Sequence, residues 1–156
     1  MQDYNKIINN LYLGNKNSLE SYNLHKYSLI INCTPDIPMF EACKNSIRLP
    51  VKDDPYESDK LYTLIYDTSV LNIIDETLKK EEKVLIHCSM GIQRSCAIVA
   101  CYLIVYNSMT PIAAITYIRH KRPIAFFGQV NFIKTIERIY LDTQHVNNIR
   151  HMSPSP

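Results

Sequence analysis

One stretch of the sequence, KVLIHCSMGIQRSCAIVACYLIVY, places a thiol and a guanidinium where they can act together. Cys88 follows a short apolar run, and Arg94 and Ser95 stand at the beginning of a second, longer apolar run. A thiolate is a strong nucleophile, and a guanidinium is a planar fork that binds two oxygens of one phosphate group. These residue types at this spacing indicate nucleophilic attack on a bound phosphate monoester.

The residues between Cys88 and Arg94 are expected to hold the phosphate. They join a predicted strand ending at His87 to a predicted helix from about Ser95, and the first turn of a helix presents free N–H groups and positive potential. Gly91 lets the loop curl tightly because it has no Cβ. The predicted phosphate-binding residues are Ser89, Met90, Gly91, Ile92, Gln93 and Arg94. The cradle would stabilise the thiolate of Cys88, which would form a phospho-cysteine, and Ser95 would donate a hydrogen bond to the departing sulfur.

The pattern is specific because several residue types coincide. Cys-x5-Arg alone arises often by chance in a chain with five cysteines and six arginines. Requiring His87, Gly91 and Ser95 at their positions as well lowers the chance frequency to the order of one in 10⁵. The competing interpretation, a buried cysteine and a surface arginine that are neighbours only in sequence, is therefore weak.

Hydrolysis also requires a proton donor for the leaving oxygen and then a base for the attacking water, and one carboxyl group can serve both steps. The acidic segment KDDP follows a predicted strand upstream of the cysteine. Asp53 and Asp54 are both candidates, because one register step exchanges them. Both could instead form a turn beside Pro55. The residues alone leave these three interpretations open.

Other polar residues near these segments carry weaker signals. His87 is interpreted as a core histidine that holds the loop, in preference to a group that tunes the thiolate. Cys33 ends a predicted strand and is a candidate resolving thiol for an oxidised Cys88. Cys96 and Cys101 lie in the apolar run and are interpreted as core residues. The basic cluster of Arg119, Lys121 and Arg122 lies at the end of the predicted helix at residues 110–121, where it would complement the dipole of that helix.

Short apolar runs alternate with longer amphipathic segments, so we expect an α/β domain with a mainly parallel central sheet flanked by helices. The predicted strands are residues 8–13, 28–33, 47–51 and 83–87. The predicted helices are residues 18–26, 58–78, 95–106, 110–121 and 127–141. We expect residues 1–142 to form one domain and residues 143–156 to be a flexible polar tail.

Composition argues against several other classes of protein. Only three glycines occur in 156 residues, and the absence of G-x-G-x-x-G and G-x-x-x-x-G-K-[ST] excludes two nucleotide-binding loops. A net charge of +2 is too small to indicate nucleic acid as a partner. No apolar run is long enough to span a membrane, and five cysteines without a signal peptide suggest a reducing compartment. We therefore expect an intracellular protein, cytoplasmic or nuclear, without a membrane segment.

The segment around Cys88 resembles the H-C-x5-R-[ST] signature of the cysteine-dependent phosphatases, and the wider chain is similar to the dual-specificity protein phosphatases. LYLGN, LIINCTP, LPVKD, RSCAIVACYLIVYNSMT and AITYIRHKRP match successive landmarks of that family over residues 5–141. The resemblance implies a cysteine-phosphatase fold without a metal or organic cofactor. It also implies phosphorylated protein substrates, with phosphotyrosine and also phosphoserine or phosphothreonine hydrolysed through a phospho-cysteine.

The resemblance further implies roles for particular residues. In the family the general acid follows a Pro-x-x pattern, which here runs from Pro50 and puts Asp53 in that role, ahead of Asp54. Arg122, with its basic neighbours, becomes the best candidate for binding a second phosphate or acidic substrate residues. Gln129 falls where the family often has glutamine, and the alternative is that it is a surface residue of the predicted helix at residues 127–141. The segment after Pro123 lacks the family's Pro-Asn turn, so the shape of the pocket is expected to differ.

Three alternative functions are weighed against this interpretation. A phosphoinositide phosphatase would need extra positive charge in the loop, but the residues between Cys88 and Arg94 are uncharged. An RNA 5′-phosphatase would need a more basic surface to hold the nucleic-acid backbone. A non-catalytic phosphopeptide-binding module would usually have lost the cysteine or the arginine, and both are present here.

Overall fold

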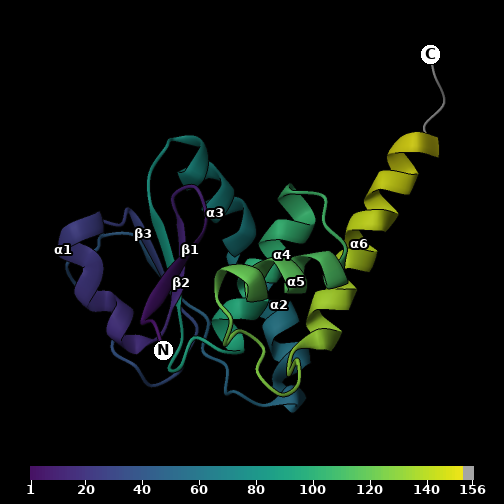
Figure 1. Cartoon of the computed structure of the whole chain (residues 1–156). Helices are drawn as coiled ribbons and strands as arrows, with labels where there is room; N and C mark the ends of the chain where they lie inside the picture. The colour runs from purple at the N-terminus through teal and green to yellow at the C-terminus, as the bar shows by residue number, and fades with distance from the viewer. Residues whose placement is uncertain (153–156) are drawn as a thin grey trace.

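Five strands form one twisted sheet with helices on both of its faces (Figure 1). The computed structural model describes residues 1–152, and the side chains of residues 1–148. The strands lie in the order β1-β2-β5-β3-β4. Their bounds are β1 Tyr4–Ile8, β2 Leu11–Gly14, β3 Leu29–Asn32, β4 Ser46–Arg48 and β5 Val84–His87. Only β1 and β2 pair antiparallel, so the predicted α/β fold with a mainly parallel sheet is confirmed.

The three central strands, β2, β5 and β3, are buried on both faces because alternate side chains enter two different cores. On one face Tyr12, Ile30 and Leu85 pack beneath the short helices η1 (Lys16–Ser21) and α1 (Tyr22–His25). On the other face the intervening residues, such as Leu13 and Ile86, join the main core with the longer helices. Figure 1 shows this division, with α1 on one side of the strands and the remaining labelled helices on the other.

The main core is organised around one buried helix. This is α4 (Arg94–Tyr106), whose first eleven residues are all buried. The other long helices are α2 Ser58–Thr68, α3 Val70–Lys79, α5 Pro111–Lys121 and α6 Ile133–Met152. Of these, α3, α5 and α6 pack against α4, and α2 packs against α6. The α5 helix starts as predicted, with Thr110 capping it and Pro111 in its first turn.

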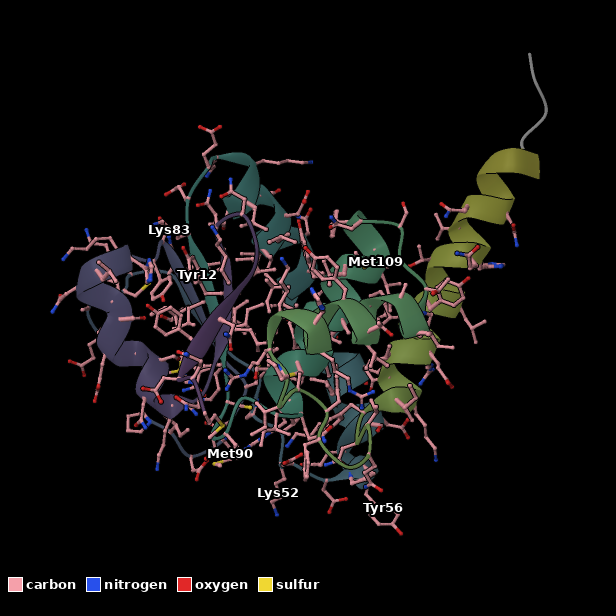
Figure 2. All side chains as sticks on the ribbon, in the orientation of Figure 1. Tyr12, Lys52, Tyr56, Lys83, Met90 and Met109 are labelled. Carbon is pink, nitrogen blue, oxygen red and sulfur yellow. The ribbon has the colours of Figure 1, made fainter. Side chains whose placement is uncertain are left out.

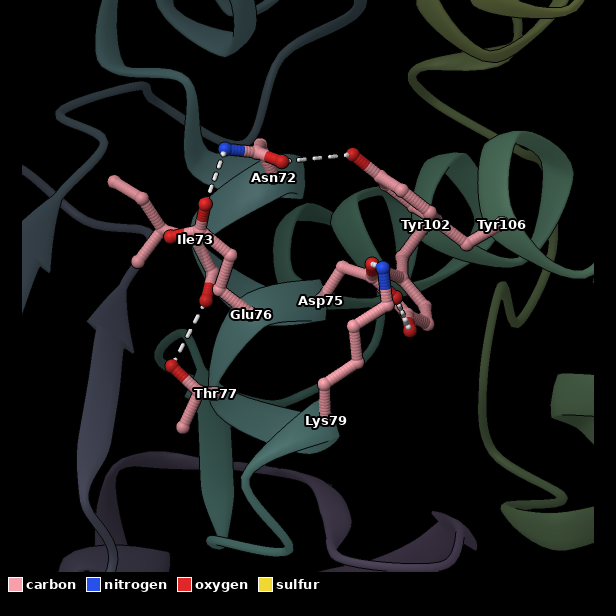
Figure 3. A network of polar contacts seen from close by, with 8 residues as sticks. All are labelled: Asn72, Ile73, Asp75, Glu76, Thr77, Lys79, Tyr102 and Tyr106. Atoms are coloured by element: carbon pink, nitrogen blue, oxygen red, sulfur yellow. Dashed lines mark hydrogen bonds and ion pairs between the residues drawn. The ribbon is translucent and has the colours of Figure 1, made fainter.

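A polar brace ties α3 to α4 inside this layer (Figure 3). The Tyr102 hydroxyl on α4 donates a 2.8 Å hydrogen bond to the carboxylate of Asp75, which is itself buried on α3. The exposed ammonium of Lys79 lies 3.0 Å from the same carboxylate. Burial and the carboxylate together raise the pKa of Tyr102. The brace therefore holds α3 against the second half of α4.

Two predicted elements are each divided in the structure. The predicted strand at residues 8–13 is two strands, β1 and β2, joined by a tight turn in which Asn10 has a φ of +66°. The predicted helix at residues 58–78 is broken at Ser69, which adopts a left-handed conformation with a φ of +55°. The break lets α2 pack against α6 while α3 packs against α4 and β5.

The predicted C-terminal helix and tail also differ from the structure. The helix does not start near residue 127: α6 begins at Ile133, after a loop that runs from Arg122 to Phe132. It then continues to Met152, past the predicted end at Leu141 and into the predicted tail. In Figure 1 this last part of α6 extends away from the other helices. Residues 153–156 of the predicted tail lie outside the described residues.

Candidate active site

Cys88 lies at the carboxyl end of the central strand β5, directly before the loop that leads into α4. The side chain is buried, and its sulfur lies 3.1 Å from the Ser95 hydroxyl. The backbone N–H of Gly91 donates to the same sulfur at 3.3 Å. These contacts place two hydrogen-bonding groups around the sulfur. The predicted neighbours Cys88, Gly91 and Ser95 are therefore brought together.

The signature loop runs from Cys88 to Arg94. The carbonyl oxygens of its residues 89 to 92 are all hydrogen-bonded to other parts of the protein. Lys16 N–H donates to Ser89 O at 3.0 Å, and Phe126 N–H donates to Ile92 O at 2.7 Å. The Arg122 guanidinium donates to Met90 O and to Gly91 O. When successive carbonyls are held from outside, the intervening N–H groups can face the inside of the curl, which is the geometry of an anion-binding nest.

Gly91 is required by a close approach of two segments. It has a φ of +67°, and a Cβ here would lie 2.7 Å from the backbone of Gly14 and from the Arg122 guanidinium. Gly14 pairs with His87 across β2 and β5, and its carbonyl accepts from Cys88 N–H at 3.3 Å. Two of the three glycines of the chain therefore meet at the signature loop, which explains their positions.

Arg122 lies behind the signature loop and is only 1% exposed. Besides Met90 and Gly91, its guanidinium donates to Gln2 O and to the Asn5 side chain, so all three nitrogens bond to the protein. This position does not fit the predicted subsite for a second phosphate. The sequence suggested such a subsite because Arg122 stands in a basic cluster. In the structure Arg119 and Lys121 are exposed, whereas Arg122 is buried. The structure places Arg122 as a brace of the loop.

Arg94 has the opposite character, since part of its guanidinium is left without a partner. One terminal nitrogen, NH1, donates to Val51 O at 2.9 Å, while the buried Nε–H has no hydrogen-bond partner among the described residues. A buried donor without a partner costs roughly 1–3 kcal/mol, so such groups are rare and usually functional. The free Nε of Arg94 is available for an oxygen of a bound anion.

The two aspartates of the acidic loop have different partners. Asp54 caps η2 (Pro55–Glu57), because its carboxylate accepts from Tyr56 N–H at 2.9 Å. Asp53 is exposed, and its carboxylate accepts from the Asn131 side chain at 2.9 Å. Asp54 is thus used to form the turn, whereas Asp53 is held by a residue from the loop before α6.

Gln93 joins that loop to the signature loop. Its amide nitrogen donates to Gln129 O at 2.6 Å, and its amide oxygen accepts from Asn131 N–H at 2.9 Å. The Gln129 side chain is exposed and donates to the Asn131 amide oxygen at 2.8 Å. The network therefore runs from the start of α4 through Gln93 and Asn131 to Asp53. Gln129 lies before α6, and not on the surface of that helix.

The remaining candidates are all buried. His87 is 1% exposed, and burial lowers its pKa to about 4, with a smaller effect from Arg48. It is neutral at neutral pH, as expected for a core histidine. Burial raises the pKa of Cys33 well above its usual value, and nearby Cys88 adds to this effect. Burial also raises the pKa of Cys96 and that of Cys101, the latter to about 12, so both are core thiols.

Two residues of the site were missed in the sequence. Asn131 lies far from the acidic loop in the chain, and no local pattern marks it. Gly14 has no local signal beyond its place directly after the predicted strand at residues 8–13, although it is one of only three glycines in the chain. Figure 2 shows the exposed rim of this region, with Met90 from the signature loop and Lys52 from the acidic loop at the same end of the molecule.

Two features are absent from residues 1–152. No group of three or more histidine, cysteine, aspartate and glutamate side chains is placed to hold a metal ion. No helix in this range is both long enough and apolar enough to cross a lipid bilayer.

Comparison with known proteins agrees with the geometry. The family described as "Dual specificity phosphatase, catalytic domain" matches residues 11–140. Protein 123R of Invertebrate iridescent virus 6, whose name describes a tyrosine phosphatase, is 30% identical over 134 residues, covering 84% of this chain and 87% of that protein. Dual specificity protein phosphatase 14 of Mus musculus is 27% identical over 76% of this chain, which spans only 60% of that relative.

Solved structures show the same fold. Human DUSP28 superimposes with a TM-score of 0.80 at 19% sequence identity, covering 92% of this chain and 97% of that one. A cysteine-centred phosphate loop on a mainly parallel sheet defines the class of cysteine-dependent phosphatases. Within that class, the match over most of its length shows that this chain belongs to the dual specificity phosphatase family.

Proposed function

We propose that this chain hydrolyses phosphotyrosine, and also phosphoserine and phosphothreonine, in protein substrates, with Cys88 as the nucleophile. The observation that carries the proposal is the unpartnered Nε of Arg94, a buried donor on the first residue of α4, the helix that the Cys88 loop opens. A phosphate oxygen would satisfy this donor, and the neighbouring loop N–H groups would bind the other oxygens. Family membership and the names of the relatives support the same reaction.

The first chemical step would transfer the phosphoryl group to sulfur. The Cys88 thiolate attacks phosphorus, an S–P bond forms, and the P–O bond to the tyrosine, serine or threonine oxygen breaks. Asp53 gives its proton to that leaving oxygen. Asn131 holds the Asp53 carboxylate from the side, which supports Asp53 over Asp54 for this role.

The second step would regenerate the enzyme. A water attacks the phospho-cysteine while the Asp53 carboxylate takes its proton, and the S–P bond breaks to release phosphate and the thiolate. The Ser95 hydroxyl, 3.1 Å from the sulfur, would donate to the departing thiolate. The residues Ser89, Met90, Gly91, Ile92 and Gln93 would contribute their backbone to the phosphate cradle in both steps.

The hydrolysis of 4-nitrophenyl phosphate tests these assignments. Cys88→Ser removes the nucleophile and should abolish turnover. Asp53→Ala should lower kcat by roughly 10²- to 10³-fold, because general acid catalysis contributes about that much. Asp54→Ala is the matched control, and it should lower kcat only a few-fold through loss of a turn. Equal losses at Asp53 and Asp54, or the reverse ranking, would contradict the role of Asp53.

Substrate class is tested with a side-by-side panel of phosphopeptides, a phosphoinositide and RNA 5′-triphosphate. We expect kcat/KM to be highest for phosphopeptides, since the signature loop carries no charge besides Arg94 and the net charge is only +2. A higher kcat/KM on the lipid or the RNA would overturn the protein-phosphatase proposal. Binding of phosphopeptides without any hydrolysis, equal for the wild type and Cys88→Ser, would show a binding module instead.

A further inference from the structure

A groove of about 590 Å³ lies beside the acidic loop and is not part of the phosphate cradle. One wall comes from η2 and the start of α2, and the other from the end of the α5–α6 loop and the start of α6. Residues that line it include Pro55, Tyr56, Val130, Asn131, Ile133 and Lys134. In Figure 2, Tyr56 stands on the same end of the molecule as Met90 of the signature loop.

The groove adjoins the position where the leaving group must be. Asn131 forms part of its wall and also holds the Asp53 carboxylate with a 2.9 Å hydrogen bond. If Asp53 protonates the leaving oxygen, as proposed above, the residues attached to that oxygen lie next to this wall. The groove is therefore within reach of the part of a substrate that flanks its phosphorylated side chain.

The two walls are tied together, so the groove exists before anything binds. The buried Thr135 hydroxyl on α6 donates a 2.7 Å hydrogen bond to Ser58 O at the start of α2. Val130 and Ile133 are half-buried and pack against the main core on their inner sides. A groove that does not have to form on binding loses less free energy to ordering.

The chemistry of the walls favours an apolar occupant. Pro55, Tyr56, Val130 and Ile133 present mainly carbon, and the Tyr56 side chain is 95% exposed. Covering an exposed aromatic ring with apolar atoms is favourable in water, because both surfaces lose contact with solvent. The other lining residues, Ser58, Gln129, Asn131 and Lys134, are polar, so the apolar part of the groove suits a single side chain.

We propose that this groove is a specificity subsite for one large apolar side chain of the protein substrate, close in sequence to the phosphorylated residue. The proposal rests on the function proposed above and adds to it a preference that the phosphate cradle cannot supply. Tyr56 and Val130 are the residues that determine the preference.

The test uses phosphotyrosine peptides in which a single leucine is moved position by position through the residues that flank the phosphotyrosine, in an otherwise polar background. Leucine at one position should raise kcat/KM by about tenfold over serine there, which is what one buried aliphatic side chain supplies. Tyr56→Ala and Val130→Ser should each remove most of this gain. Leu24→Ala, which truncates an exposed apolar residue on α1, is the control and should keep the gain.

Turnover of 4-nitrophenyl phosphate separates this proposal from the proposed function. It should be the same for the wild type, Tyr56→Ala, Val130→Ser and Leu24→Ala, which also shows that the variants are folded. No leucine preference at any position, or a preference that survives both groove variants, would overturn the subsite while leaving the phosphatase intact. Failure of the wild type to hydrolyse any phosphopeptide would overturn the proposed function instead.

Discussion

At the scale of single residues, the site depends on which polar groups are already bonded. Arg94 and Arg122 are both buried arginines beside the signature loop, yet only Arg94 keeps a free N–H. Arg122 donates hydrogen bonds to four acceptors of the protein, two of which are carbonyl oxygens of that loop. One arginine is therefore available to an anion, and the other holds the loop that would receive it.

The role of Arg122 leads to a prediction about small substrates. Arg122→Ala should lower the turnover of 4-nitrophenyl phosphate by at least about tenfold and lower the melting temperature, because it leaves buried carbonyl oxygens unpaired. Lys121→Ala, its exposed neighbour, should change neither quantity. A subsite for a second phosphate would predict something else: unchanged turnover of this monophosphate, with a loss confined to doubly phosphorylated peptides.

At the scale of elements, the site lies at the carboxyl ends of the parallel strands. The ends of β2 and β5 lie side by side there, and α4 begins directly after the loop that they support. The loop before α6 then crosses to the acidic loop through Gln93, Asn131 and Asp53. Three segments distant in sequence thus form one site because parallel strands end at the same edge.

The brace between α3 and α4 should support stability without supporting chemistry. Asp75→Ala removes the acceptor of the buried Tyr102 hydroxyl and should lower the free energy of unfolding by about 1–3 kcal/mol, as measured by urea denaturation. The kcat for 4-nitrophenyl phosphate should stay close to wild type. Glu76→Ala on the exposed side of α3 is the matched control, with an expected change within about 0.5 kcal/mol.

A double-mutant cycle with Tyr102→Phe would check that the effect comes from this hydrogen bond. The two single changes should be strongly non-additive, because each removes the same interaction. Additive losses would show that the 2.8 Å contact contributes nothing of its own.

At the scale of the whole molecule, buried His87 makes stability depend on pH. Its pKa is about 4 in the folded protein, compared with an ordinary value of 6.5, so the unfolded chain binds a proton that the folded protein does not. Stability should therefore fall as the pH drops from 6.5 towards 4, by roughly 3 kcal/mol for this one group. Above pH 6.5 the contribution of His87 is constant.

Urea denaturation at a series of pH values measures this dependence. His87→Asn should flatten the slope of unfolding free energy against pH in that window, even if it lowers stability overall. His145→Asn, which changes an exposed histidine on α6, should leave the slope as in the wild type. An unchanged slope for His87→Asn would mean that other groups cause the acid sensitivity.

Across all three scales, the features that were predicted correctly are those that local sequence encodes. The Cys88 loop follows β5 and opens α4, and the alternation of apolar runs and amphipathic segments predicted the α/β fold. Predictions that went wrong depended on distant partners. The break at Ser69 lets α2 and α3 pack against different partners, and the loop that delays the start of α6 is held by hydrogen bonds from Gln93.

What the sequence alone determined was the set of reactive groups, because Cys88, Gly91, Arg94 and Ser95 are neighbours in the chain and need only one strand–loop–helix unit to meet. The tertiary structure decided which surrounding groups serve that unit. It buried Arg122 behind the loop, set Gly14 against Gly91 and brought Asn131 to Asp53. The physical reason is that a hydrogen-bond donor or a close backbone approach has meaning only when its partner is known, and these partners lie far away in the sequence.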